Sequence, residues 1–146
     1  MRSGNGSLLY LDANILVALL TPEPFSGRAD AFLQTNTEPL IVSDFAAAEF
    51  SSAVARRVRM REFTRRQAQI TLSGFDTWLT RMADRVEISS VDIAVATAFL
   101  RRLDLTLRTP DAIHIAIAER IGATLVTFDQ RMSESARALG MAVATP

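Results

Sequence analysis

Short strand-like segments alternate with longer segments of helical periodicity, and this alternation is the feature that most restricts how the chain can fold. Strands joined by helices are expected to be parallel, because a parallel connection must cross back over the sheet. The sequence therefore predicts an α/β fold of three layers, in which helices cover both faces of a central, mainly parallel sheet. The predicted strands span residues 8–11, 40–42, 86–88, 123–127 and 141–144.

The predicted helices are delimited by residues that commonly begin or end helices. Thr64 and Gln67 have the spacing of a capping box, and Thr109 with Pro110 places a cap and a proline at a helix start. Gly122 follows the last turn of that helix, where glycine commonly ends helices. The predicted helices span residues 13–20, 26–36, 44–61, 65–82, 90–102, 110–121 and 130–139.

Two groups of helical residues have opposite expected environments. The helix over residues 65–82 carries an apolar stripe, which we expect in the core, with a contact to a second subunit or partner protein as the alternative for part of it. Asp92 and Asp104 are expected on solvent-facing sides of their helices. The apolar stripe consists of Phe75, Trp78, Leu79 and Met82.

The composition is that of one globular domain over residues 1–146, and it excludes several chemistries. Hydrophobic residues make up 49% of the chain, which is enough for a packed core. Cysteine is absent, which excludes disulfides and thiol catalysis, and all 16 basic residues are arginine. Without lysine there is no Walker-A phosphate loop and no Schiff-base chemistry. The net charge is zero, so binding of nucleic acid requires a local basic patch.

No segment has the features of a secretory signal or a membrane span. The apolar stretch over residues 8–20 is interrupted by Asp12 and Asn14, whereas the core of a signal is unbroken. None of the apolar stretches is long enough to cross a bilayer. We therefore expect a cytoplasmic protein that does not use a membrane, with residues 1–7 as a flexible tail.

Four acidic residues are predicted to meet at one edge of the sheet. Asp12 follows the first strand directly, and Asp129 follows the strand over residues 123–127. Asp111 lies in the first turn of its helix, and Glu49 lies near the start of the helix after the second strand. Ligands of open α/β sheets bind in the crevice beyond the carboxyl ends of the strands, so this edge is the expected site.

A cluster of carboxylates points to a divalent cation. Carboxylates held close together repel one another and take up protons, unless a cation neutralises them. Oxygen ligands suit Mg²⁺ or Mn²⁺ better than zinc, and such ions activate water for phosphodiester hydrolysis. Taken singly, Asp12 and Asp129 have the alternative role of helix caps, and Asp111 that of a favourable first-turn acid. Their joint placement, with Glu49 on an apolar stretch, favours a shared metal site.

Four motifs resemble those of the PIN-domain nucleases, in the same order along the chain. They are residues 11–16 (LDANIL), 43–50 (SDFAAAEF), 109–116 (TPDAIHIA) and 123–129 (ATLVTFD). The size of the chain also resembles that of the VapC toxins, which are the ribonuclease components of bacterial type II toxin–antitoxin pairs.

This resemblance implies an endoribonuclease that depends on Mg²⁺ or Mn²⁺ and hydrolyses RNA phosphodiester bonds with metal-activated water. It also implies a homodimer and a small antitoxin protein that blocks the site. By position it assigns catalysis and metal binding to Asp12, Glu49, Asp111 and Asp129, and supporting roles to Asn14 and Thr127.

Arginines and the single histidine are the other candidates for function. His114 shares a helix face with Asp111, but its apolar neighbours favour a core residue bonded to backbone or to an acid, so it is left out of the predicted site. For the densest basic segment three interpretations stay open: contact with RNA phosphates, contact with the antitoxin, or a solvated surface. Its members are Arg56, Arg57, Arg59, Arg61, Arg65 and Arg66.

Two other functions remain as alternatives. A small-molecule phosphohydrolase would also use clustered carboxylates. However, the chain has Asn14 where haloacid-dehalogenase-like enzymes have a second aspartate, and it lacks their lysine. The other alternative is a PIN-like module that binds RNA or protein without catalysis, and the intact set of four acids argues against it.

Overall fold

The computed structural model describes residues 8–146, so the predicted tail over residues 1–7 lies outside the described part of the chain. Five strands form one sheet in the order β3-β2-β1-β4-β5, and every neighbouring pair is parallel. The strands are β1 (Leu8–Leu11), β2 (Leu40–Ser43), β3 (Ala83–Val86), β4 (Ala123–Val126) and β5 (Val143–Ala144).

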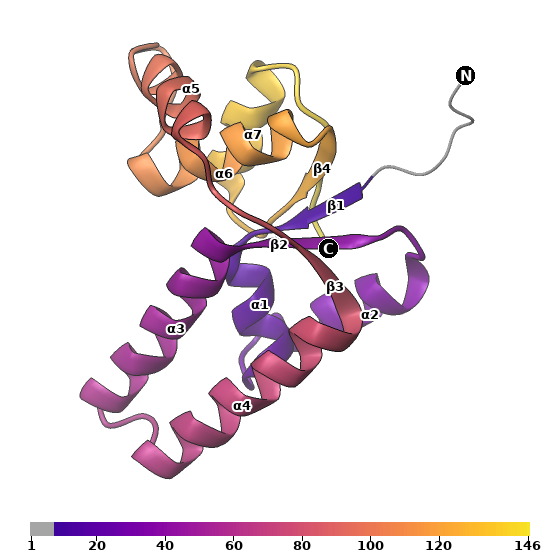
Figure 1. The fold of residues 1–146 in the computed structure, drawn as a ribbon, viewed down its shortest axis with the longest axis vertical. Coiled ribbons are helices and arrows are strands. Elements are labelled where there is room, and N and C mark those ends of the chain that lie inside the picture. The colour runs from indigo at the N-terminus through magenta and orange to yellow at the C-terminus, as the bar shows by residue number, and fades with distance from the viewer. Residues whose placement is uncertain (1–7) are drawn as a thin grey trace.

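Seven helices in the described part of the chain connect these strands and cover both faces of the sheet (Figure 1). No helix among residues 8–146 has the length and apolar character needed to cross a membrane. The helices are α1 (Ala13–Leu20), α2 (Ser26–Thr35), α3 (Asp44–Arg59), α4 (Arg65–Met82), α5 (Ser90–Leu100), α6 (Thr109–Arg120) and α7 (Gln130–Ala138).

The alternation of side chains along the strands divides the core into two clusters, one on each face of the sheet. Leu9 and Leu11 of β1 pack with Phe50 of α3 and with residues of α1 and α4. Tyr10, which lies between them, faces the opposite side and packs with α6 and α7. Figure 1 shows the two helical layers, with α1 to α4 on one side of the sheet and α5 to α7 on the other.

The predicted strand over residues 86–88 was misplaced and overlaps β3 only at Val86. β3 begins directly after α4, with no intervening loop. It is an edge strand, and Asp84 and Arg85 are exposed in its middle. An exposed edge strand needs no apolar run, and therefore the apolar signal was found at its end rather than along it.

The apolar stripe of α4 is only partly in the core. Phe75 and Leu79 are buried, and Trp78 packs against them from a half-buried position. Met82 is 53% exposed, so its predicted place in the core was wrong. It is the last residue of α4 and directly precedes β3.

Asp92 was predicted to be solvated, but it is buried in an ion pair. Its two carboxylate oxygens accept hydrogen bonds from Arg120 of α6 at 2.7 and 2.9 Å, and one also accepts from the Ser89 amide at 2.8 Å. Burial alone would raise the pKa of Asp92, but the hydrogen bonds and charge of Arg120 outweigh it and hold this pKa below its usual value. The pair joins α5 to α6.

Replacing Asp92 by Ala should lower the free energy of unfolding by about 2 kcal/mol, because buried hydrogen bonds to charged groups are lost. Chemical denaturation measures the change. The matched control is Asp104→Ala. Asp104 is exposed as expected, although it lies in a turn after α5 and not on a helix, and it pairs with Arg102 on the surface, where a salt bridge contributes little. Equal effects of the two substitutions would contradict the structural role of the α5–α6 pair.

Candidate functional site

The four predicted acids line one cavity at the carboxyl ends of β1 and β4. Its volume is about 280 Å³. Asp12 lies between β1 and α1, Glu49 lies on α3, and Asp111 lies in the first turn of α6. Asp129 precedes α7 and completes the acidic set. The remaining wall consists of Ala13, Asn14, Arg108, Pro110, His114 and Met132.

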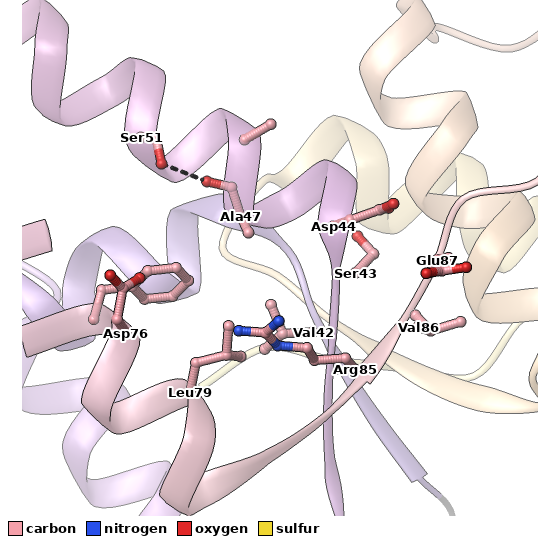
Figure 2. Close-up of a pocket in the computed structure, with 12 residues that line it drawn as sticks. Val42, Ser43, Asp44, Ala47, Ser51, Asp76, Leu79, Arg85, Val86 and Glu87 are labelled. Atoms are coloured by element: carbon pink, nitrogen blue, oxygen red, sulfur yellow. Dashed lines mark hydrogen bonds between the residues drawn. The ribbon is translucent and has the colours of Figure 1, made fainter. Parts of the chain in front are cut away.

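A second cavity, of about 350 Å³, lies between α3, α4 and β3 (Figure 2). Arg85 extends across it from β3 toward Leu79, while Asp44 and Glu87 lie near its other end (Figure 2). None of the predicted catalytic, metal-binding or supporting residues lines this cavity. The acidic cavity is therefore the candidate site, although it is the smaller of the two.

Asp12 is the most deeply buried of the four acids, with 2% of its surface exposed. One carboxylate oxygen accepts from the Ile15 amide at 3.2 Å, and the other accepts from the Thr127 hydroxyl. Burial raises the pKa of Asp12 to about 6, although these hydrogen bonds act in the opposite direction. Near neutral pH the carboxylate is thus ionised at an energetic cost that a nearby cation would relieve.

Asn14 and Thr127 connect this carboxylate to the turn between β4 and α7. The Thr127 oxygen accepts from the Asp129 amide at 2.9 Å and from the Asn14 side-chain amide at 3.2 Å. Asn14 in turn accepts from the Phe128 amide at 3.1 Å. Both predicted supporting residues therefore contact acids of the cavity or the backbone that carries them.

Asp111 and Asp129 combine lining the cavity with capping a helix. Asp111 accepts from the Arg108 amide at 3.2 Å, and Asp129 accepts from the Met132 amide at 3.0 Å. Burial raises the pKa of Asp111, and the negative charge of Asp129 contributes to the increase. The cap expected at Asp129 and the first-turn position expected for Asp111 are thus observed, although the N-cap of α6 is Arg108 and not Thr109 as predicted. Neither role excludes a place in the cavity.

Two polar residues of the cavity were not part of the site predicted from the sequence. His114 is 2% exposed, and its Nε2 forms a short hydrogen bond with Glu49. The sequence signal was its spacing from Asp111. Of the two partners expected for it, backbone or an acid, the structure shows an acid. Arg108 lies at the rim, with its guanidinium 3.9 Å from the Asp111 carboxylate. No sequence signal distinguished it from the other arginines.

The six clustered arginines lie away from the acidic cavity. Arg56 and Arg59 lie on the last turns of α3, and Arg65 begins α4. Figure 1 shows α3 and α4 joined at their end distant from the sheet, and this α3–α4 tip carries the arginines. None of them lines the acidic cavity, so any contact they make belongs to a separate surface.

The acidic cavity suits a hydrated divalent cation better than a fully ligated one. Within residues 8–146, no three Asp, Glu or His side chains lie close enough together to enclose a metal ion. Its acidic donors are carboxylates, which Mg²⁺ and Mn²⁺ prefer, and Mg²⁺ commonly keeps several waters while one or two carboxylates bind it. The raised pKa values of Asp12 and Asp111 indicate that the surrounding protein groups do not fully neutralise the two carboxylates.

Comparison with known proteins identifies the family. A model of the PIN domain matches residues 9–138. Ribonuclease VapC46 of Mycobacterium tuberculosis is 36% identical over 141 residues, which cover 94% of this chain and 97% of that protein. The chain is a PIN-domain protein of the VapC family. The resemblance inferred from the four motifs is thus confirmed.

Solved structures of other proteins share the fold of this PIN-domain protein. VapC20 of Mycobacterium tuberculosis, described as a toxin that cleaves the sarcin–ricin loop, has a TM-score of 0.73 at 18% identity, over 94% of this chain and 99% of that chain. VapBC2 of Rickettsia felis, solved with a promoter DNA fragment, has a TM-score of 0.71 at 19% identity, over 95% and 98% of the two chains. The predicted α/β fold with a parallel sheet is confirmed.

The raised pKa of Asp12 predicts how the stability of this PIN-domain protein depends on pH without metal. Because the pKa of Asp12 is higher in the folded than in the unfolded protein, its protonated carboxyl group adds to the free energy of unfolding. This addition is fully present below the unfolded pKa of 3.8 and is lost as pH rises through about 6. Between pH 4 and pH 7, wild type should therefore lose up to about 3 kcal/mol relative to Asp12→Asn, which does not titrate. Urea denaturation in EDTA measures this difference, and parallel pH profiles would contradict the raised pKa.

Proposed function

We propose that this PIN-domain protein is the endoribonuclease toxin of a type II toxin–antitoxin pair and acts on RNA in the cytoplasm. The observation that carries the proposal is the meeting of four carboxylates, from different segments of the chain, in one cavity at the carboxyl edge of the sheet. Relatives at 36% and 32% identity are named ribonucleases, and the alignments cover 97% of each. This agreement favours RNA over a small phosphorylated molecule as substrate.

In this proposal the cavity would hold a hydrated Mg²⁺ or Mn²⁺ among the carboxylates of Asp12, Glu49, Asp111 and Asp129, with only some of the four as direct ligands and water completing the rest. A bound divalent cation supplies the positive charge that acidifies a water molecule and stabilises the oxygens of the phosphodiester. Thr127 keeps the Asp12 carboxylate fixed through its hydroxyl, and Asn14 fixes the turn that carries Asp129. Pre-organisation of this kind keeps the acids in position without rearrangement at the moment of reaction.

The rim of the acidic cavity offers positive groups for an RNA phosphate. Arg108 lies there with 80% of its side chain exposed, and it lies next to the amino-terminal end of α6. A helix start and an exposed guanidinium both favour phosphate. The arginines of the α3–α4 tip form a separate surface, which we assign either to more distant RNA phosphates or to the antitoxin.

A small antitoxin and a second copy of the chain are the proposed protein partners. Solved structures described as VapBC, from Rickettsia felis and Salmonella typhimurium, share the fold. On this chain, exposed apolar side chains lie on α5 and in the segment after it, where Val91, Ile93 and Leu103 are 59%, 46% and 92% exposed. Exposed apolar groups of this size support burial against a partner.

Purified protein, free of partner, should cleave cellular RNA in the presence of Mg²⁺ or Mn²⁺ and not in EDTA. Asp12→Asn and Asp111→Asn should each lower the cleavage rate at least about 100-fold, because each removes a charge that holds the cation. Gel analysis of the RNA products measures the rates, and thermal melting verifies that the variants are folded.

The matched control for these variants is Asp84→Asn, which changes an exposed carboxylate on the edge strand β3 and should keep the wild-type rate. Full activity in both Asp12→Asn and Asp111→Asn would overturn the assigned site. Absence of cleavage by the folded wild-type protein with either metal would instead favour the binding-module alternative.

Metal binding should also raise the melting temperature. At a metal concentration ten times the dissociation constant, linkage adds about 1.4 kcal/mol to the free energy of unfolding, or about 3 to 6 °C for a chain of this size. Differential scanning calorimetry with and without MnCl₂ measures the shift, which should be much smaller in Asp12→Asn. A wild-type shift no larger than that of the variant would contradict a cation site at Asp12.

A further inference from the structure

His114 lies at the centre of a buried chain of hydrogen bonds that ends at the acidic cavity. Its Nε2 bonds to Glu49 on α3, and its Nδ1 lies 2.7 Å from the phenolic oxygen of Tyr10 on β1. The Tyr10 oxygen lies 2.7 Å from the hydroxyl of Ser43, which also accepts from the Ala46 amide. Four side chains from β1, β2, α3 and α6 are thus connected in one line.

Only one order of donors and acceptors along this chain of hydrogen bonds gives every polar hydrogen an acceptor. If Ser43 donates to Tyr10 and Tyr10 donates to Nδ1, then the neutral imidazole carries its proton on Nε2 and donates it to Glu49. In the reverse direction, with Nδ1 donating to Tyr10 and Tyr10 donating to Ser43, the hydroxyl proton of Ser43 would have no acceptor among the described residues. Burial raises the pKa of Tyr10, which keeps its phenol protonated and able to donate.

The imidazole ring is also fixed by its neighbours. The ring of Phe45 lies 5.0 Å from it, centre to centre, and the ring of Tyr10 lies 5.7 Å from it, both tilted by about 55°. Such tilted aromatic contacts are favourable, and they leave the buried ring little room to rotate. The donor at Nε2 therefore points in a constant direction, toward α3.

Glu49 needs such a fixed donor more than the other acids of the cavity do. Its side chain has three rotatable bonds and is 30% exposed, whereas Asp12, Asp111 and Asp129 are held by backbone amides. His114 binds only Oε1 of Glu49, and no hydrogen bond among the described residues occupies Oε2. The second oxygen is thus left available to the cavity.

We propose that His114, which donates from Nε2 and accepts from Tyr10 at Nδ1, is a positioning residue that holds Glu49 at the acidic cavity, and that Tyr10 and Ser43 fix this arrangement of protons. The inference rests on the proposed function, because it treats Glu49 as a carboxylate that holds a cation. Partners beyond the direct ligands, which orient them, typically change metal affinity by about 10- to 100-fold.

The tautomer is tested in the metal-free protein, without any activity measurement. His114 is the single histidine of the chain, so the imidazole nitrogens of untagged, ¹⁵N-labelled protein are assigned without ambiguity. Long-range ¹H–¹⁵N spectra at pH 7.5 in EDTA should show a protonated Nε2 and an unprotonated Nδ1. Tyr10→Phe removes the donor to Nδ1 and should produce a mixture of tautomers. A protonated Nδ1 in wild type would overturn the proposed order of donors.

Two amide substitutions separate the two hydrogen bonds of His114. In His114→Gln the side-chain amide lies near the place of Nε2 and retains a donor toward Glu49, whereas in His114→Asn it lies near Nδ1 and does not reach Glu49. Calorimetric titration with MnCl₂ should give a dissociation constant within about threefold of wild type for His114→Gln and about 10-fold weaker for His114→Asn.

The outcomes distinguish this inference from the proposed function. Wild-type Mn²⁺ affinity in a folded His114→Asn variant would overturn the positioning role and leave the nuclease proposal intact. Absence of Mn²⁺ binding by wild type would overturn both the cation site and the role of His114 toward it, whatever tautomer the spectra show. Weaker binding in His114→Asn together with recovery in His114→Gln would support the inference.

Discussion

The buried carboxylate of Asp12 is the constraint on which the acidic cavity depends. It lies where β1 ends and α1 begins, so the sheet and the helix start define its place. Burial makes its charge costly, and neither the Thr127 hydroxyl nor the Ile15 amide brings a full positive charge. The fold therefore holds a negative charge that is incompletely compensated by protein groups, which is the condition under which a cation binds.

The helix ends around the cavity have two purposes at once. Asp12 and Asp129 accept backbone amides of α1 and α7 as ordinary caps, and Asp111 accepts the amide of Arg108. Each carboxylate uses part of its hydrogen-bonding capacity for the helix and keeps lone pairs available. The backbone thereby fixes three acids at little cost in side-chain entropy, because an aspartate has only two rotatable bonds.

Glu49 is held differently, because it lies inside α3 rather than at its end. Its donor is His114 of α6, whose ring packs against Tyr10 and Phe45. The α5–α6 unit that carries His114 is itself joined by the Asp92–Arg120 pair. The packing of α5 and α6 on one face of the sheet thus helps to place Glu49, which belongs to a helix on the other face.

The amino-acid sequence by itself determined the order of strands and helices, the parallel sheet and the four acids of the cavity. Strand-like segments and helical periodicity show which residues within one element are buried. The four family motifs locate the acids because they occur in a constant order along the chain. Only the tertiary structure decided that β3 is an exposed edge strand, that Asp92 is buried and that His114 contacts Glu49. These features depend on which neighbours a residue meets across 28 to 65 positions of sequence or across the sheet. Local pattern carries no information about such neighbours, because burial and hydrogen bonding are properties of the packed elements and not of one element alone.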